Sequence, residues 1–344
     1  MSSATLAILS FIVISFSWIV YIVQEMFITG SSALNMAVSE SEAERKQIQV
    51  ISGLHFDGIE VWLLSALTLT LGLFPLVFAE TFTYLYVIFF LLLYAIIGRG
   101  ISIEVIYKMD SKKWIKAMVI TWTVSSALLI FLLGVYLSNI FYGFPLDSSG
   151  DMSSNYFSLL NVTGISGGIF FLSSALVAGA GWIKINTTGN VGDKAVKVVK
   201  KYGVIYVMFI SLMITVMGFN NTDASIYIGE LFSKSIIFFV LPIITLIFAL
   251  MTLYSGFKER GKRLFIFGLL TMAFFLITGF VGIFPYMVPS NILISNGITI
   301  YDSIVSNKAV EVVLIVVIIF YPLIFLYQGW KYMKFAKKVN LDDK

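Results

Sequence analysis

Long apolar runs recur along the whole chain and are separated by short polar segments. Runs of about 20 residues are long enough to cross a bilayer as α-helices. The pattern predicts nine such helices, at residues 5–27, 58–79, 82–104, 115–138, 157–183, 203–219, 234–255, 263–284 and 309–331. Because only loop-length segments separate them, we expect an all-α polytopic membrane protein in which residues 1–344 form a single transmembrane domain.

The two longest polar segments are expected to be loops, at residues 28–57 and 285–308. The second contains Pro285 and Pro289 and a stretch rich in Ser and Asn, which predicts an ordered cap rather than a helix. The small-residue stretches GISGG (164–168) and GAG (179–181) fall in the fifth predicted helix. They indicate that this helix packs closely on a neighbour within the chain.

The distribution of basic residues predicts the orientation of the helices. If the N-terminus lies outside the cell, nineteen of the 23 Lys and Arg residues fall in segments on the cytoplasmic side. The outer segments then hold only Lys234 and Lys308. Because cytoplasmic loops are enriched in Lys and Arg, the nine helices are predicted to run N-out and C-in.

The composition supports a membrane protein and excludes several kinds of site. The chain is 59% hydrophobic and 12% charged, whereas soluble domains are about 25% charged. It has no cysteine and one histidine, which excludes disulfides, thiolate-metal sites and a self-contained multi-haem centre. We therefore expect no catalytic residue, bound cofactor or metal in this chain, and the net charge of +4 requires no nucleic-acid partner.

Six ionisable residues are predicted to gather near the cytoplasmic boundary of the first three helices. Glu25 ends the first helix, Arg99 and Glu104 end the third, and the second opens with His55, Asp57 and Glu60. A charge inside the membrane costs at least about 2.5–3.5 kcal/mol, so each of these residues requires an explanation.

Two explanations remain open from the residues alone. In the structural one, Asp57 caps its helix and Arg99 neutralises a nearby carboxylate. In the functional one, Asp57 and Glu60, three residues apart on one helix face, form a proton-entry site together with the imidazole of His55. This pattern is compatible with a proton-coupled transporter and with a subunit of a redox complex.

Several motifs occur in an order that resembles a known family. HFDGIEVW (55–62) opens the second helix, Arg99 and Glu104 stand five residues apart in the third, and later motifs follow in sequence: SLLNVTGISGG (158–168), TTG (187–189), FPYMVPSN (284–291) and YPLIFLYQGWKYMKF (321–335). Together they span nearly the whole chain. In this order they resemble subunit II of the cytochrome bd quinol oxidases.

The resemblance implies a fold, a partner and an activity. The fold would be two four-helix bundles plus one helix, in the prokaryotic cell (inner) membrane. The partner would be a haem-bearing subunit I with two b-type haems and one d-type haem, which oxidises quinol and reduces dioxygen to water. This chain would be the non-haem half of that heterodimer, with the presence of small accessory subunits left open.

The resemblance also implies roles for individual residues. Asp57 is the main candidate for a proton path from the cytoplasm, with His55 beside it. Glu25, Glu60 and Glu104 would be further acids of this path, and Arg99 would be their charge partner. Trp62 would lie near an apolar route for dioxygen.

The sequence departs from the family pattern at the end of the first helix. EMFITGSS (25–32) replaces a stretch that is richer in acids and glycines, and Ile28 stands where relatives have a second acid. Glu25 and Asp57 would then act differently, or Glu60 would take over. Two alternatives follow: a proton-coupled secondary transporter, and a paralogue that kept the scaffold without oxidase activity. A transporter would bind substrate near mid-membrane through interrupted helices.

Overall fold

The computed structural model describes residues 1–148, 159–200, 203, 206, 209–210, 237–334 and 338–339. This part of the chain is helical apart from turns, two isolated bridges and one small β-hairpin. It contains eight helical segments long and apolar enough to span a membrane. These are α1 (Ser3–Val38), α2 and α3 together (Glu42–Gly53 and Phe56–Leu73), α5 (Tyr86–Val105), α6 (Lys112–Tyr142), α7 (Val162–Asn186), α10 (Ile237–Phe257), α11 (Gly261–Ile283) and α13 (Asn307–Lys334).

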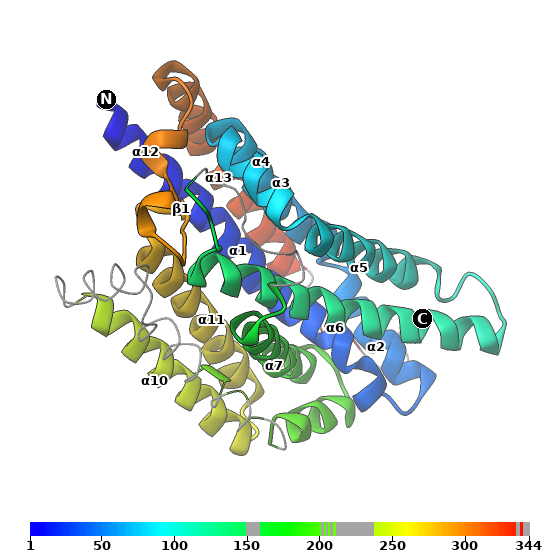
Figure 1. Ribbon diagram of the computed structural model, residues 1–344. Helices are drawn as coiled ribbons and strands as arrows, with labels where there is room; N and C mark the ends of the chain where they lie inside the picture. The colour runs from blue at the N-terminus through cyan, green and yellow to red at the C-terminus, as the bar shows by residue number, and fades with distance from the viewer. Residues whose placement is uncertain are drawn as a thin grey trace.

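Eight of the nine predicted spans therefore coincide with helices, and the sixth, 203–219, lies largely outside the described residues. Figure 1 shows α1 crossing the middle of the molecule, with α3, α4 (Pro75–Tyr84) and α5 on one side and α7, α10 and α11 on the other. Helix α1 contacts α3, α6, α7 and α11, so it is the element around which the others pack.

The predicted loop at 28–57 is wrong, because helix α1 continues to Val38 and α2 follows it. The extension is stabilised by a close crossing of α1 and α7. A Cβ atom added to Gly30 would clash with the backbone oxygen of Ala175, and one added to Gly179 would clash with the backbone of Gly30. This contact buries the small residues of the stretch in a helix, although their polarity alone predicts a loop.

Close packing of α7 was predicted from its glycines and is confirmed on both of its sides. Gly179 meets α1, as described above. Toward the other end of α7, a Cβ atom on Gly167 would clash with the hydroxyl oxygen of Ser138 in α6. Helix α7 therefore joins α1 to α6 at distances that only glycine allows.

A proline divides the second predicted span. Helix α3 ends at Leu73, and α4 starts with Pro75 at its first position, where the missing N–H is not needed. The third span, α5, then begins at Tyr86 rather than at residue 82.

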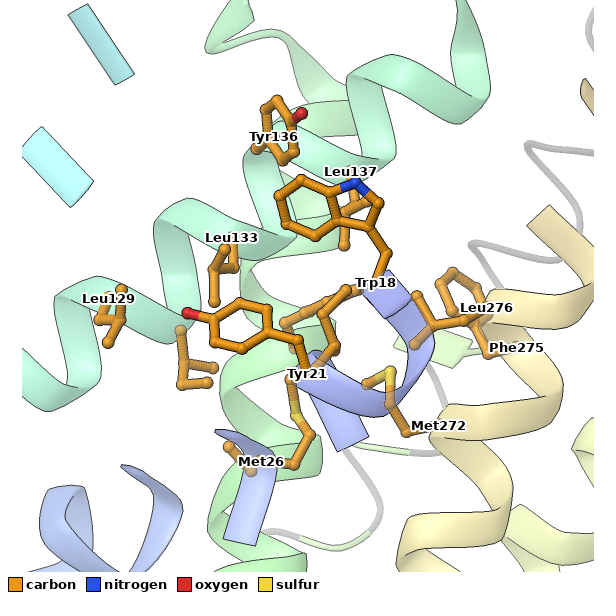
Figure 2. Close-up of a cluster of buried hydrophobic side chains, with 14 of the residues drawn as sticks. Trp18, Tyr21, Met26, Leu129, Leu133, Tyr136, Leu137, Met272, Phe275 and Leu276 are labelled. Carbon is orange, nitrogen blue, oxygen red and sulfur yellow. The ribbon is translucent and has the colours of Figure 1, made fainter. Parts of the chain in front are cut away.

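The core between α1, α6 and α11 is rich in aromatic side chains and predominantly apolar. Figure 2 shows Trp18 and Tyr21 of α1 facing Leu133 and Tyr136 of α6, with side chains of α11 on the other side of α1. The Trp18 ring centroid lies 5.8 Å from that of Tyr136. Buried aromatic side chains of this size contribute most of the packing energy of such a core.

The segments predicted to lie outside the cell meet at one end of the molecule. The ordered cap predicted at 285–308 is confirmed: it contains β1 (Tyr286–Val288), a short 3-10 helix η2 (Ile294–Asn296), β2 (Ile298–Thr299) and α12 (Ile300–Ser303). The amide of Phe144 donates to the carbonyl of Pro289 at 2.9 Å. The amide of Val305 donates to the carbonyl of Leu73 at 3.1 Å.

The segments predicted to be cytoplasmic meet at the opposite end. The side-chain amide of Gln47 in α2 donates to the carbonyl of Val339 at 2.7 Å, and the amide of Val339 donates to the carbonyl of Asn186 at 2.9 Å. Lys200 pairs with Glu259 at 2.6 Å. The predicted grouping of loops on two sides therefore agrees with the fold.

Candidate functional site

A buried ion pair joins α1 to α5. The side chains of Glu25 and Arg99 are 0% and 1% exposed. A guanidinium nitrogen of Arg99 donates to the Glu25 carboxylate and to the hydroxyl of Thr29, and that hydroxyl also donates to Glu25. The three side chains thus form one hydrogen-bonded group inside an apolar protein interior.

The length of α1 creates this group. Tyr21, Glu25 and Thr29 are spaced by four residues, so they lie on one face of the helix. Arg99 reaches this face from α5, and its guanidinium also lies 4.6 Å from the ring of Phe56. A first helix that ended at residue 27 would not carry Thr29, so the extension completes the site.

Glu60 connects this buried pair to the surface. Its carboxylate lies 3.9 Å from the second terminal nitrogen of Arg99, and its side chain is 32% exposed. Asp57, one helical turn earlier in α3, is exposed and interacts electrostatically with Glu60. The carboxylates of Asp57, Glu60 and Glu25 are therefore progressively more buried.

Some buried polar atoms of the site have no hydrogen-bond partner among the described residues. They are one carboxylate oxygen each of Glu25 and Glu60, and the Nε of Arg99. Buried polar atoms without partners are uncommon because each costs about 1–3 kcal/mol of desolvation. Acceptor atoms held in this way can take a hydrogen bond or a proton from an arriving group.

His55 lies apart from the carboxylates. It is buried, its ring stacks on that of Tyr332 at 4.2 Å, and the ring of Trp182 lies 5.7 Å away. No hydrogen bond links it to Asp57 in the described part of the chain. The prediction that Asp57 caps its helix is also wrong: the N-cap of α3 is His55, without a side-chain hydrogen bond. Aromatic packing of His55 against α7 and α13 holds the N-terminal end of α3 in place.

The remaining predicted residues occupy different environments. Glu104 is exposed on α5, with no ion pair among the described residues. Trp62 is fully buried, and its indole N–H donates to the side-chain oxygen of Gln328 in α13 at 2.9 Å. The Gln328 amide in turn donates to the carbonyl of Gly58 at 2.6 Å. Trp62 thus joins α3 to α13.

Sequence reasoning identified the carboxylates and Arg99 but missed Thr29, Tyr21 and Gln328. The spacing of four between Tyr21, Glu25 and Thr29 was the available signal, and it is visible only if the helix is extended past residue 27. Nothing in the sequence indicated Gln328, because its partner Trp62 lies on a distant helix.

An apolar cavity of about 370 Å³ adjoins the buried charges. It lies among α1, α3, α5 and α6, and Tyr21 belongs to its lining. Leu63 and Leu67 of α3 face it as well, whereas Trp62 does not. No group of three His, Cys, Asp or Glu side chains in the described residues is arranged to hold a metal ion.

The sequence matches a known family over nearly its whole length. Residues 6–335 match the family described as cytochrome bd terminal oxidase subunit II. The chain is 26% identical over 342 residues to cytochrome bd ubiquinol oxidase subunit 2 of Bacillus subtilis, covering 98% of each protein. It is 21% identical over 349 residues to cytochrome bd-I ubiquinol oxidase subunit 2 of Escherichia coli, covering 94% of this chain and 92% of that protein.

A solved structure has the same fold. A chain in the structure of the bd oxidase from Geobacillus thermodenitrificans superimposes with a TM-score of 0.74 at 16% sequence identity. The match covers 97% of this chain and 100% of that chain. At this identity the likeness concerns the arrangement of the helices.

Proposed function

Because the chain belongs to the cytochrome bd terminal oxidase subunit II family, we propose that it is the non-haem subunit of a membrane-bound quinol oxidase. Its partner is a haem-bearing subunit I that oxidises quinol and reduces dioxygen to water. The observation that carries this assignment is the match over residues 6–335.

The haems belong to the partner in this proposal, two of b type and one of d type. The only imidazole of the chain is His55, which is stacked on Tyr332 and contacts Trp182. A chain with this one imidazole offers no pair of imidazole ligands. The haems would supply electron transfer and the site of dioxygen reduction, while this chain would supply routes to that site.

The proposed topology is nine helices, two four-helix bundles plus one, running N-out and C-in. The concentration of basic residues in one set of loops supports this orientation. The meeting of α2, the end of α7 and the C-terminal segment at one end agrees with it.

The proposed proton path runs from Asp57 through Glu60 to Glu25. The decrease in exposure along these carboxylates supports this order. So does the oxygen on each of the two inner ones that has no hydrogen-bond partner in the described part of the chain. Arg99 contacts both inner carboxylates, so it keeps them close together. His55 and Glu104 are not in contact with these three carboxylates, so in this proposal they are secondary residues outside the main path.

The proposed oxygen route is the apolar cavity among α1, α3, α5 and α6. Dioxygen is small and apolar, so it partitions into membrane and into spaces of this kind. Trp62 supports the route indirectly by holding α3 against α13.

A transporter is a weaker candidate on the geometry. Its substrate site would be formed by interrupted helices near mid-membrane. Pro242 and Pro322 both lie inside uninterrupted helices, α10 and α13. Among the described residues, the buried charges of α1, α3 and α5 are instead paired with one another.

The test is purification of the tagged protein in mild detergent, followed by a reduced-minus-oxidised spectrum. We expect a larger membrane subunit to co-purify with haem signals, including a far-red chlorin band. A colourless single chain, obtained from membranes that contain the oxidase, would overturn the proposal and favour a paralogue without oxidase activity.

A further inference from the structure

A cavity of about 450 Å³ opens beside the first turns of α6, away from the buried charges. It lies between α6, the end of α1 and the start of α2. Three basic side chains line it, those of Arg45, Lys112 and Lys116, and one acid, Glu42.

Within the described part of the chain, no ion pair neutralises the basic side chains of this cavity. Glu42 pairs with Lys46 at 3.7 Å. Arg45, Lys112 and Lys116 have no ion pair among the described residues, and the Nε of Arg45 is buried without a hydrogen-bond partner. In addition, the first turn of α6 carries no acid, so lysines stand at the positive end of the helix dipole. Like charges placed in this way favour binding of an anion from outside the chain.

The α6 wall of the cavity is not charged along its whole length. Lys112 and Lys116 lie on one face of α6, and Ile120 continues the same row one turn further along the helix. The row therefore changes from basic at the helix start to apolar toward the middle of the span. A phospholipid in the adjoining leaflet presents its groups in the same order, headgroup first and acyl chains next.

We propose that this cavity binds the headgroup of an anionic phospholipid, with Arg45, Lys112 and Lys116 contacting the phosphate and Ile120 contacting the upper acyl chain. Basic pockets between membrane helices recognise anionic lipid headgroups through the same combination of charges and apolar wall. The site depends on the membrane location of the chain and not on the oxidase activity. The proposed lipid site can therefore be correct or wrong independently of the proposed function.

The experiment uses the complete complex, purified in detergent and delipidated. Phosphatidylglycerol, phosphatidylcholine or inorganic phosphate is titrated in, and the melting temperature of the complex is recorded. We expect phosphatidylglycerol to raise the melting temperature until the binding site is saturated. Phosphatidylcholine and inorganic phosphate should have little effect on it. Each basic residue near an anionic lipid contributes roughly a fivefold factor in affinity, so Lys112→Gln/Lys116→Gln should weaken this binding about 30-fold.

A charge-matched control is Lys108→Gln/Lys113→Gln, which removes two nearby lysines that do not line the cavity. It should bind phosphatidylglycerol as the unmodified complex does, and Lys112→Arg/Lys116→Arg should retain binding. Equal losses in the two Gln doubles would overturn the proposal in favour of diffuse surface attraction. A full response to inorganic phosphate would overturn the lipid assignment. If Lys112→Gln/Lys116→Gln does not assemble, Arg45→Gln replaces it, and unchanged phosphatidylglycerol content of that purified complex would overturn the site.

Discussion

The guanidinium of Arg99 in α5 donates to the carboxylate of Glu25 in α1, and both side chains are at most 1% exposed. A buried charge that keeps its partner is tolerated, whereas one that loses its partner is strongly destabilising. The loss of stability on removing one partner, compared with removing both, therefore tests whether the pair is structural.

Arg99→Ala should reduce the stability of the complex by about 3–5 kcal/mol, because it leaves the Glu25 carboxylate buried without a countercharge. The measurement is the melting temperature and yield of the purified complex. Glu25→Gln/Arg99→Met removes both charges and should recover most of the loss. Full assembly of Arg99→Ala with no turnover would instead place the arginine in the chemistry rather than in the fold.

Asp57→Asn should leave assembly intact and slow oxygen consumption about tenfold or more, because the outermost carboxylate of the proposed path can no longer titrate. Glu60→Gln should act in the same direction. The measurement is oxygen uptake by the purified complex with saturating quinol. Glu104→Gln, on an exposed side chain without an ion pair in the described residues, is the matched control and should change the rate much less. Normal turnover in Asp57→Asn would remove this residue from the path.

Leu67→Trp should raise the KM for dioxygen several-fold with little change in kcat, because the larger side chain fills the apolar cavity. The same substitution at Leu71, one turn further along α3 and 50% exposed, is the control. Initial rates of oxygen uptake at varied dioxygen concentration distinguish the two. An unchanged KM in a folded Leu67→Trp complex would argue against the cavity as the oxygen route.

Gly30→Ala should destabilise the complex by about 3 kcal/mol or more, since the added methyl group meets the backbone of Ala175 and pushes α1 from α7. Gly282→Ala is the matched control in α11, where a Cβ atom meets nothing within 4 Å. Alanine favours helices over glycine by about 1 kcal/mol, so this control should be neutral or slightly stabilising. Thermal unfolding of the two variants provides the comparison, and equal melting temperatures would contradict the close crossing.

The sequence was sufficient for those parts of the fold that depend on apolar length. Each described span coincides with an apolar run, because a membrane helix needs little more than that. The end of α1 was mispredicted because Gly30, Ser31 and Ser32 look like a loop, and only their contact with α7 makes them helical. Tertiary packing there outweighs local polarity.

The candidate site was predictable in its members but not in its connections. Acids and an arginine near one boundary were visible in the sequence, yet only the structure shows that Glu25 is the carboxylate bound by Arg99. His55 and Asp57 are two residues apart, and that spacing does not determine which of them turns inward. His55 is buried because the rings of Tyr332 and Trp182 surround it, and both belong to distant helices.

The hydrogen bond between Gln47 and Val339 joins residues 292 positions apart in the sequence. The ribosome therefore synthesises these two residues at different times. Helix α2 is made early, whereas its partner follows the last membrane helix, α13. During translation Gln47 and the turn after α7 cannot make their contacts with Val339 until all later helices have been made. This contact therefore forms only after nearly the whole chain has been synthesised.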